Sequence, residues 1–171
     1  MIIYKDIITN DEMFSDIYSL KTAHEEVLFE VEGKLISRKE GQIDDSLIGG
    51  NASAEDQGDT YDENTVSGVD IVMNHNLQEI YFEKKEFKKY IQAYLKDIKT
   101  KLEESNPDRV KPFMEGSKTA VVEILKNFNN YKFYQGESLT EGGAVGFLDY
   151  REDGITPFML FFKDGLEIEK C

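Results

Sequence analysis

The feature that most constrains this chain is a long acidic segment without any positive charge. From Glu40 to Glu83 the sequence contains eleven Asp or Glu residues and no Lys or Arg. Its first part, residues 40–66, has almost no periodic apolar pattern. The Gly-Gly-Asn sequence at 49–51 favours bends, because glycine and asparagine tolerate positive φ. These features predict a long flexible acidic loop, and loops of this length usually have a function or are disordered.

The rest of the chain predicts a β-rich body. Runs with strand character occupy residues 1–8, 27–32, 34–39, 69–73, 77–82, 131–135, 144–150, 157–162 and 166–169. We expect 27–32 and 34–39 to pair as a hairpin across Gly33. Asp153-Gly154 and Asp164-Gly165 should form hairpin turns, because Asp-Gly between apolar runs favours such turns.

Two helices are predicted between about residues 84 and 128. Apolar residues recur at three- and four-residue spacing in both, which is typical of helices with one buried side. The first set is Phe87, Ile91, Tyr94, Leu95, Ile98 and Leu102, and the second is Val110, Phe113, Met114, Val121, Ile124, Leu125 and Phe128. The short link at 103–106 predicts an antiparallel hairpin, and Pro112 should distort or delay the start of the second helix. We therefore expect a single α+β domain over residues 1–171.

The composition and motifs argue against several classes of function. The net charge of −14 disfavours nucleic-acid binding. No apolar run approaches 20 residues, and the first residues lead directly into charged sequence, so we expect a cytoplasmic protein without a membrane span or signal peptide. His24 and His75 lie in no metal-binding spacing, and no GxSxG, P-loop or GxGxxG motif occurs. We expect no enzyme and no required cofactor, and we interpret His75 as a turn or packing residue.

Positive charge is concentrated in the predicted hairpin. Residues 83–126 carry eleven Lys or Arg and eight Asp or Glu, a balance of +3, whereas the remainder carries −17. Five lysines fall on the predicted outer side of the first helix: Lys85, Lys88, Lys89, Lys96 and Lys99. They form either a solvated helix face or a docking surface for an acidic protein, such as the acidic tails of tubulin.

The acidic segment offers oxygen ligands for a hard cation. Asp44, Asp45, Asn51 and Glu55 could converge on calcium, although no EF-hand loop is present. Ordering such a loop costs about 1–2 kcal/mol per residue, so we expect at most weak binding. The alternative is diffuse attraction of ions to a solvated loop.

Three residues are candidates for covalent modification. Ser46 in Asp44-Asp45-Ser46-Leu47 and Thr65 in Glu63-Asn64-Thr65-Val66 each have an acidic residue at −2 and an apolar residue at +1. This pattern suits a kinase with a basic subsite beside an apolar one, such as the polo-like kinases. Cys171, the only cysteine, is either a spectator thiol or the site of an intermolecular disulfide, so we expect mostly monomer with a Cys171-linked dimer under oxidising conditions.

Several motifs together resemble a known family. They are MIIYKDIITNDEMFSD, IGGNASAE, GVDIVMNHNLQE, RVKPFM, FYQGES and LDYREDGITPFMLFFKDGLEIEKC. These sequences resemble the translationally controlled tumour protein (TCTP) family over essentially the whole chain. The resemblance implies a β-tent or β-sandwich-like body (Mss4-like), an inserted helical hairpin and a flexible acidic loop.

The resemblance also implies function. TCTP proteins bind calcium and associate with microtubules, which supports the tubulin interpretation of the lysines, and the family is modified in the sequence matching Asp44–Leu47. At the family's second modification site this chain has Asn64-Thr65, so only Thr65 could be modified. Similarity to Rab-binding proteins makes Glu12 a candidate contact for a small GTPase.

We therefore interpret the chain as a cytosolic multi-partner regulatory protein, calcium-binding and microtubule-stabilising, linked to cell growth and survival. The first alternative is a guanine-nucleotide exchange factor or chaperone for a Ras-like small GTPase. The second is an anti-apoptotic adaptor for Bcl-2-family proteins, or an adaptor for translation elongation factors.

Overall fold

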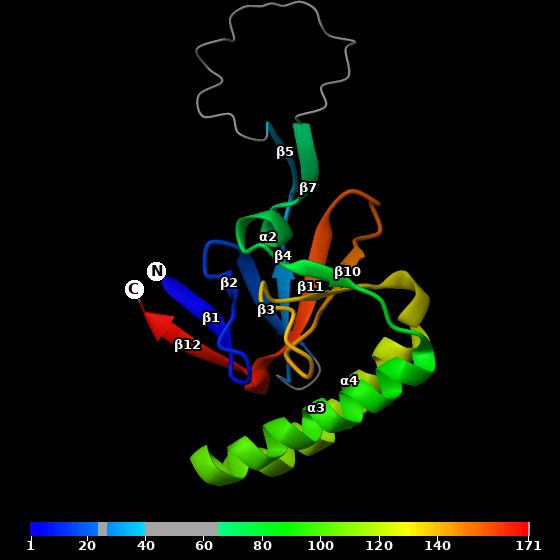
Figure 1. The fold of residues 1–171 in the computed structure, drawn as a ribbon. Coiled ribbons are helices and arrows are strands. Elements are labelled where there is room, and N and C mark those ends of the chain that lie inside the picture. The colour runs from blue at the N-terminus through cyan, green and yellow to red at the C-terminus, as the bar shows by residue number, and fades with distance from the viewer. Residues whose placement is uncertain (24–26, 40–64, 171) are drawn as a thin grey trace, which may run out of the picture.

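The structure is a computed structural model that describes residues 1–23, 27–39 and 65–170. The predicted acidic loop lies almost wholly outside these residues. The described part contains three antiparallel sheets and a helical hairpin, so the predicted α+β class is confirmed (Figure 1). None of its helices is long and apolar enough to cross a membrane.

Two sheets form the body. The three-stranded sheet has the order β12 (Leu166–Lys170), β1 (Ile2–Asp6) and β2 (Glu12–Ser15). The six-stranded sheet has the order β3 (Ser19–Ala23), β4 (Leu28–Glu32), β11 (Pro157–Phe162), β10 (Gly146–Tyr150), β9 (Lys132–Gln135) and β8 (Gln78–Ile80). Strands β5 (Leu35–Lys39) and β7 (Thr65–Val69) form a separate ribbon that projects from the body (Figure 1).

Aromatic side chains connect the two sheets of the body. Tyr4 of β1 stacks on Phe14 of β2 with ring centroids 4.6 Å apart. Phe14 in turn packs against Phe161 of β11 at 4.8 Å. All three side chains are buried. Burial of rings this large is the main stabilising term of a core, and it fixes the three-stranded sheet on the six-stranded one.

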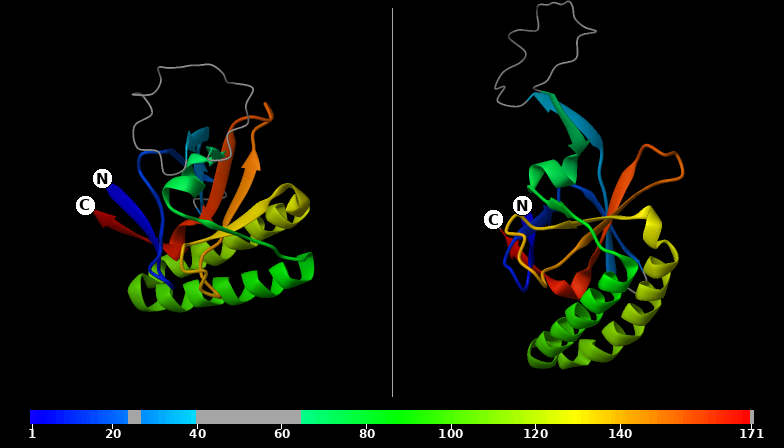
Figure 2. Two further views of the ribbon diagram at one scale, coloured as in Figure 1. Left: turned by 45° about the horizontal axis from the view of Figure 1, so that its top comes forward. Right: turned by 45° about the vertical axis from the view of Figure 1, so that its right-hand side comes forward.

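The helical hairpin lies across one end of the body (Figures 1 and 2). It comprises α3 (Lys84–Ser105), the 3-10 turn η2 (Pro107–Arg109) and α4 (Val110–Lys126), and the 3-10 turn η3 (Phe128–Asn130) follows. Glu83 and Glu86 form a capping box that satisfies N–H groups at the start of α3. The delayed start of the second helix is confirmed, because η2 comes before α4. Phe87 anchors α3 in the core, 5.5 Å from Phe133 and 5.8 Å from Phe147 between ring centroids.

The segment after Lys34 differs from its prediction. Residues 27–32 and 34–39 do not pair as a hairpin, because β4 lies between β3 and β11 and β5 pairs with β7. The N–H of Gly33 donates to the carbonyl of Pro157, and the N–H of Lys34 donates to the carboxylate of Asp70. These long-range hydrogen bonds turn the chain out of the six-stranded sheet.

The predicted strand at 69–73 is also wrong. Strand β7 ends at Val69, and α2 (Asp70–Asn74) follows at once. The Asp70 carboxylate accepts hydrogen bonds from the N–H groups of Ile71 and Lys34, 2.8 and 2.9 Å long. A carboxylate at the first helical turn favours the helix, and here it overrides the β-branched composition of the segment.

Three smaller differences concern turns and packing. Asp153-Gly154 forms the predicted turn between β10 and β11, but Asp164-Gly165 lies in the 3-10 turn η4 (Lys163–Gly165), where the chain passes between sheets. Met114 is exposed, because Gly116, Ser117 and Ala120 provide the small buried side of α4. The sequence predicted neither strand β2 nor strand β3.

Candidate functional site

The first candidate site is the lysine surface of α3, formed by Lys85, Lys88, Lys89, Lys96 and Lys99. Four of these lysines are exposed and Lys99 is half-buried. The opposite side of α3 is buried through Phe87, Ile91, Tyr94, Ile98 and Leu102. The amphipathic spacing therefore turns the ammonium groups outward, as the sequence predicts.

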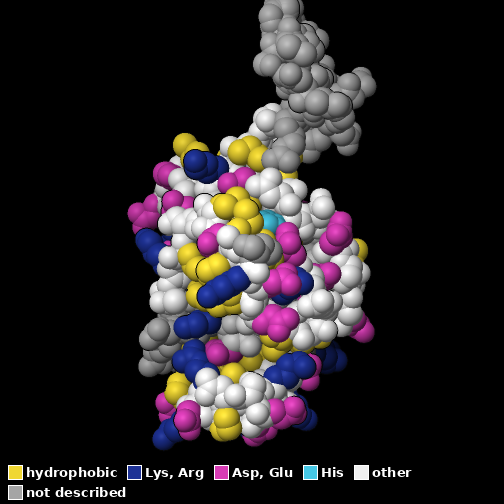
Figure 3. Space-filling view, turned by 90° about the vertical axis from the view of Figure 1, so that its left-hand side faces the viewer, with side chains coloured by type: hydrophobic (Ala, Val, Ile, Leu, Met, Phe, Trp, Pro, Cys, Tyr) yellow, Lys and Arg dark blue, Asp and Glu magenta, His cyan; other side chains and the backbone are white. Residues whose placement is uncertain are grey.

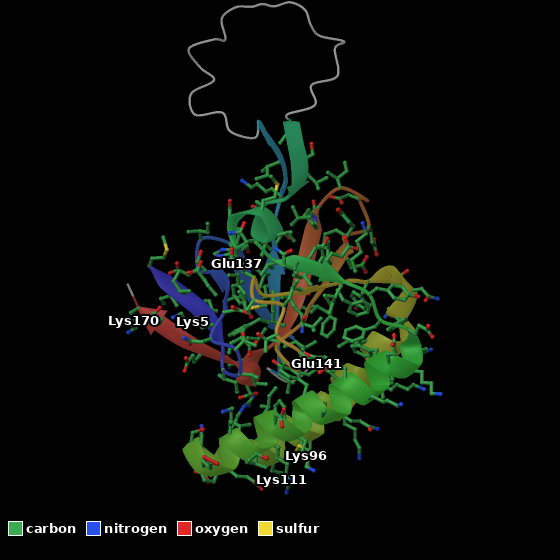
Figure 4. The ribbon with its side chains drawn as sticks, viewed as in Figure 1. Lys5, Lys96, Lys111, Glu137, Glu141 and Lys170 are labelled. Carbon is green, nitrogen blue, oxygen red and sulfur yellow. The ribbon has the colours of Figure 1, made fainter. Side chains whose placement is uncertain are left out.

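The lysine surface extends onto the second helix. Lys96 of α3 and Lys111 of α4 lie on the side of the hairpin that faces away from the sheets (Figure 4). Sequence reasoning missed Lys111 and Lys118, which are exposed on α4 and are seven residues apart, a spacing that puts them on one side of the helix. None of the five α3 lysines forms an ion pair with another residue in the described part of the chain. Their charge is therefore available to a partner.

The second candidate site surrounds Glu12, the first residue of β2. Nδ1 of His75 lies 3.0 Å from Oε2 of Glu12. The His75 side chain is only 7% exposed, whereas that of Glu12 is 48% exposed. The ring of Tyr18 packs edge-on against His75 at 5.8 Å, and the Tyr18 hydroxyl accepts a hydrogen bond from Asn74. A buried imidazole thus holds one oxygen of a carboxylate whose other side faces solvent.

A loop far along the sequence completes this second site. Ser138 donates to the carboxylate of Asp11 at 2.6 Å, and Asn76 donates to Glu137 at 3.3 Å. We call the group Asp11, Glu12, His75, Asn76 and Glu137 the Glu12 surface. In Figure 3, Asp and Glu side chains gather beside the histidine on this face of the molecule. The Glu12 surface is therefore acidic.

A buried carboxylate fixes the loop behind the Glu12 surface. Oδ1 of Asp6 accepts the N–H of Ile8 at 2.9 Å, and its Oδ2 accepts the hydroxyl of Thr9 and the N–H of Ala144 at 2.9 and 2.7 Å. The hydroxyl of Tyr90 donates to the carbonyl of Gly143 at 2.7 Å, and burial raises the pKa of Tyr90 well above its ordinary value. The phenol therefore stays protonated and keeps its donor role. These contacts tie the turn after β1 and helix α3 to the same loop.

One part of His75 has no polar partner. Across the described ranges 1–23, 27–39 and 65–170, no hydrogen bond reaches its buried Nε2. The Nε2 side of the ring is therefore buried by packing, as predicted, whereas the Nδ1 side contacts Glu12. No sequence signal could have found that contact, because the two residues are 63 positions apart.

Most of the remaining predicted residues lie outside the part of the chain that the structure describes. Asp44, Asp45, Asn51 and Glu55, the candidate calcium ligands, lie outside the described residues, as do Ser46 and Cys171. Thr65 begins β7. In the described part of the chain, no group of three or more His, Cys, Asp or Glu side chains could hold a metal ion.

Comparison with known proteins places this fold in a family. The family model described as translationally controlled tumour protein matches residues 1–167. The chain belongs to the TCTP family. This family is non-enzymatic, in agreement with the expectation from the sequence.

Individual relatives match over their full length. The chain is 60% identical to a translationally-controlled tumor protein homolog from Labeo rohita and 59% identical to the translationally-controlled tumor protein of Mus musculus, and each match covers all of both chains. Among solved structures it is similar to the translationally controlled tumor-associated protein p23fyp from Schizosaccharomyces pombe, with a TM-score of 0.82 and 43% identity over the whole of both chains.

Proposed function

We propose that this TCTP-family protein is a cytoplasmic regulatory protein with several partners, and that it binds microtubules through the lysine surface. The observation that carries this proposal is the set of α3 lysines that point outward without ion-pair partners in the described part of the chain. The acidic tails of tubulin provide the complementary charge. Such contacts steer association and depend strongly on salt.

The strength of this contact follows from the number of charges. An exposed ion pair contributes about 0.2–1 kcal/mol, so four pairs contribute about 1–4 kcal/mol together. Exposed charges are screened over about 8 Å at physiological ionic strength. We therefore expect affinity for microtubules that falls as salt increases.

The test is co-sedimentation of the full chain with microtubules. Replacing Lys85, Lys89, Lys96 and Lys99 by Glu should abolish binding and leave the circular dichroism spectrum unchanged, because these side chains do not enter the core. The matched control replaces four exposed lysines outside the hairpin: Lys21, Lys34, Lys132 and Lys170. Both variants change the charge by −8, from −14 to −22, since each Lys→Glu exchange contributes −2. Equal binding by the two variants would contradict the proposal.

Calcium binding and phosphorylation remain proposals for the acidic segment. We propose weak calcium binding by Asp44, Asp45, Asn51 and Glu55. Phosphorylation of Ser46 adds about −1.5 to −2 charges at neutral pH, and it should weaken microtubule binding by competing for the lysine surface. A Ser46→Glu variant that binds microtubules as well as Ser46→Ala would exclude such a switch.

A second candidate function is nucleotide exchange on a small GTPase. The observation that favours it is the Glu12 surface, where His75 holds one carboxylate oxygen of Glu12 and leaves the side chain half exposed. An exchange factor needs no cofactor if it binds the nucleotide-free GTPase more tightly than the loaded form. The test measures nucleotide release from a panel of Ras-like GTPases with wild type and Glu12→Gln. Release at the uncatalysed rate throughout would exclude this function.

A further inference from the structure

A groove beside the lysine surface of α3 shares only Lys89 with it and is otherwise not used by the proposed functions. A cavity of about 470 Å³ lies between α3, the end of β8 and the loop at residues 136–142. Its apolar and aromatic lining consists of Ile80, Phe82, Tyr90, Ala93, Tyr94 and Leu139. Its volume is within the range of sites that accept a small molecule or a large side chain. We call it the α3 groove.

Leu139 is the most unusual residue of the α3 groove. Its backbone has φ of 53°, in the left-handed region that a bulky side chain rarely adopts, and it is 50% exposed. Two hydrogen bonds hold this conformation. The N–H of Leu139 donates to the carbonyl of Gly136 at 3.0 Å, and the side-chain amide of Gln135 donates to the carbonyl of Thr140 at 3.2 Å. Backbone strain of this kind costs about 1–3 kcal/mol and is concentrated at binding sites. Here it presents an apolar side chain at the wall of an open groove.

The rim of the groove is acidic. Glu86 and Asp97 of α3 line the groove on one side, and Glu141 lines it from the loop at residues 136–142, where Figure 4 labels it. All three are exposed, and none forms an ion pair with another described residue. Lys89 is the only cation among the described residues that line the groove, so the rim has a net charge of −2. This charge is opposite to that of the neighbouring lysine surface.

We propose that the α3 groove binds a short, positively charged peptide segment of a partner protein. One bulky apolar side chain of the peptide occupies the cavity between Ala93 and Leu139. Lys or Arg residues on either side of it pair with Glu86, Asp97 and Glu141. This arrangement has the features of small protein interaction sites, in which an apolar anchor supplies affinity and rim charges supply orientation and specificity.

Charge also argues against two other occupants. An acidic segment of the kind that suits the lysine surface is repelled by the rim. A second copy of this chain carries a net charge of −14 and is repelled over most of its surface. The basic peptide is therefore the occupant that the described residues favour.

The test uses the isotope-labelled full chain and a synthetic probe, acetyl-Lys-Lys-Leu-Phe-Lys-Lys-amide, followed by nuclear magnetic resonance. Two control peptides replace either the four lysines by Glu or the Leu-Phe pair by Ser-Ser. We expect saturable chemical-shift changes at Ala93, Leu139 and Gly142, and binding of each control peptide at least about tenfold weaker. Equal binding of either control peptide, or shift changes confined to the lysine surface, would overturn the proposal.

Variants at adjacent positions of α3 provide the matched comparison. Ala93→Arg fills the groove and reduces the net charge of its rim from −2 to −1, whereas Gln92→Arg adds the same side chain at an exposed position that does not line the groove. We expect Ala93→Arg to weaken probe binding at least about tenfold and Gln92→Arg to change it less than about threefold. Leu139→Gly removes the wall side chain and relieves the strained backbone, so it should fold normally and also weaken binding. Concentration-dependent shifts in the groove without peptide would assign it to a second copy, which would also overturn the proposal.

Discussion

One ion pair adds to the core packing that holds the hairpin on the body, and its geometry permits a quantitative prediction. Arg109 in η2 donates through Nε to Oδ1 of Asp164 and through Nη2 to Oδ2, each at 3.0 Å. The side chains are only 21% and 10% exposed. Hydrogen bonds between charged groups contribute about 1.5–3 kcal/mol, and removing one partner of a fully buried pair costs about 3–5 kcal/mol. For this partly buried pair we expect Asp164→Ala to lower the free energy of unfolding by about 2–3 kcal/mol.

The assay is urea unfolding of the single variants and of the double variant. In a cycle with Arg109→Met and Asp164→Ala, the coupling free energy should be about 1.5–3 kcal/mol, because the two charges contact each other directly. For a chain of this length, each kcal/mol corresponds to about 2–4 °C in melting temperature. A coupling free energy below about 0.5 kcal/mol would contradict this prediction, since it would mean that the pair is effectively solvated.

Three further predictions concern stability and ion binding. Burial, with a smaller contribution from Glu79, raises the pKa of Tyr134 from 10.0 to about 12, so the folded protein keeps a proton that the unfolded chain releases above pH 10. The stabilisation from Tyr134 should be fully present below pH 10 and lost as pH rises toward 12. Above pH 10 the free energy of unfolding should therefore fall less steeply with pH for Tyr134→Phe than for wild type, and identical pH profiles of the two proteins would contradict this. Gly165→Ala should destabilise the fold by about 1–3 kcal/mol in urea unfolding, because the new Cβ would collide with the buried hydroxyl of Tyr94. An unchanged free energy of unfolding would show that the neighbouring side chains move aside without cost. Calcium titration by calorimetry should give a dissociation constant no tighter than about 10⁻⁴ M, and either micromolar affinity or no binding at tens of millimolar would refute it.

The elements that local pattern determines could be predicted from the sequence. The hairpin follows from its apolar stripes, and its lysines face outward because the opposite side of α3 is buried. The late start of the second helix is local too: the 3-10 turn η2 comes first, and Pro112 lies in the first turn of α4, where a missing N–H breaks no helical hydrogen bond. The turn at Asp153-Gly154 is local in the same way: Oδ1 of Asp153 accepts the N–H groups of Ile155 and Thr156, each at 2.8 Å.

The features that long-range contacts determine could not be predicted. Strand β5 leaves the six-stranded sheet because Gly33 and Lys34 bond to residues far away in the sequence. The contact between Glu12 and His75 depends on how α2 packs against β2. The same holds for Leu139. Its backbone has a positive φ, which bulky residues rarely adopt, and hydrogen bonds within the loop hold that conformation. Periodicity and composition carry no information about such pairs.

We propose that the lysine surface binds microtubules through the acidic tails of tubulin. The most direct measurement compares co-sedimentation of the wild-type chain with intact microtubules and with microtubules whose acidic tails have been removed by subtilisin, at physiological salt. At concentrations well below saturation, we expect clear binding to intact microtubules and loss of at least about nine-tenths of it after tail removal, which corresponds to a factor of ten in affinity or about 1.4 kcal/mol. Undiminished binding to the tailless microtubules would contradict it.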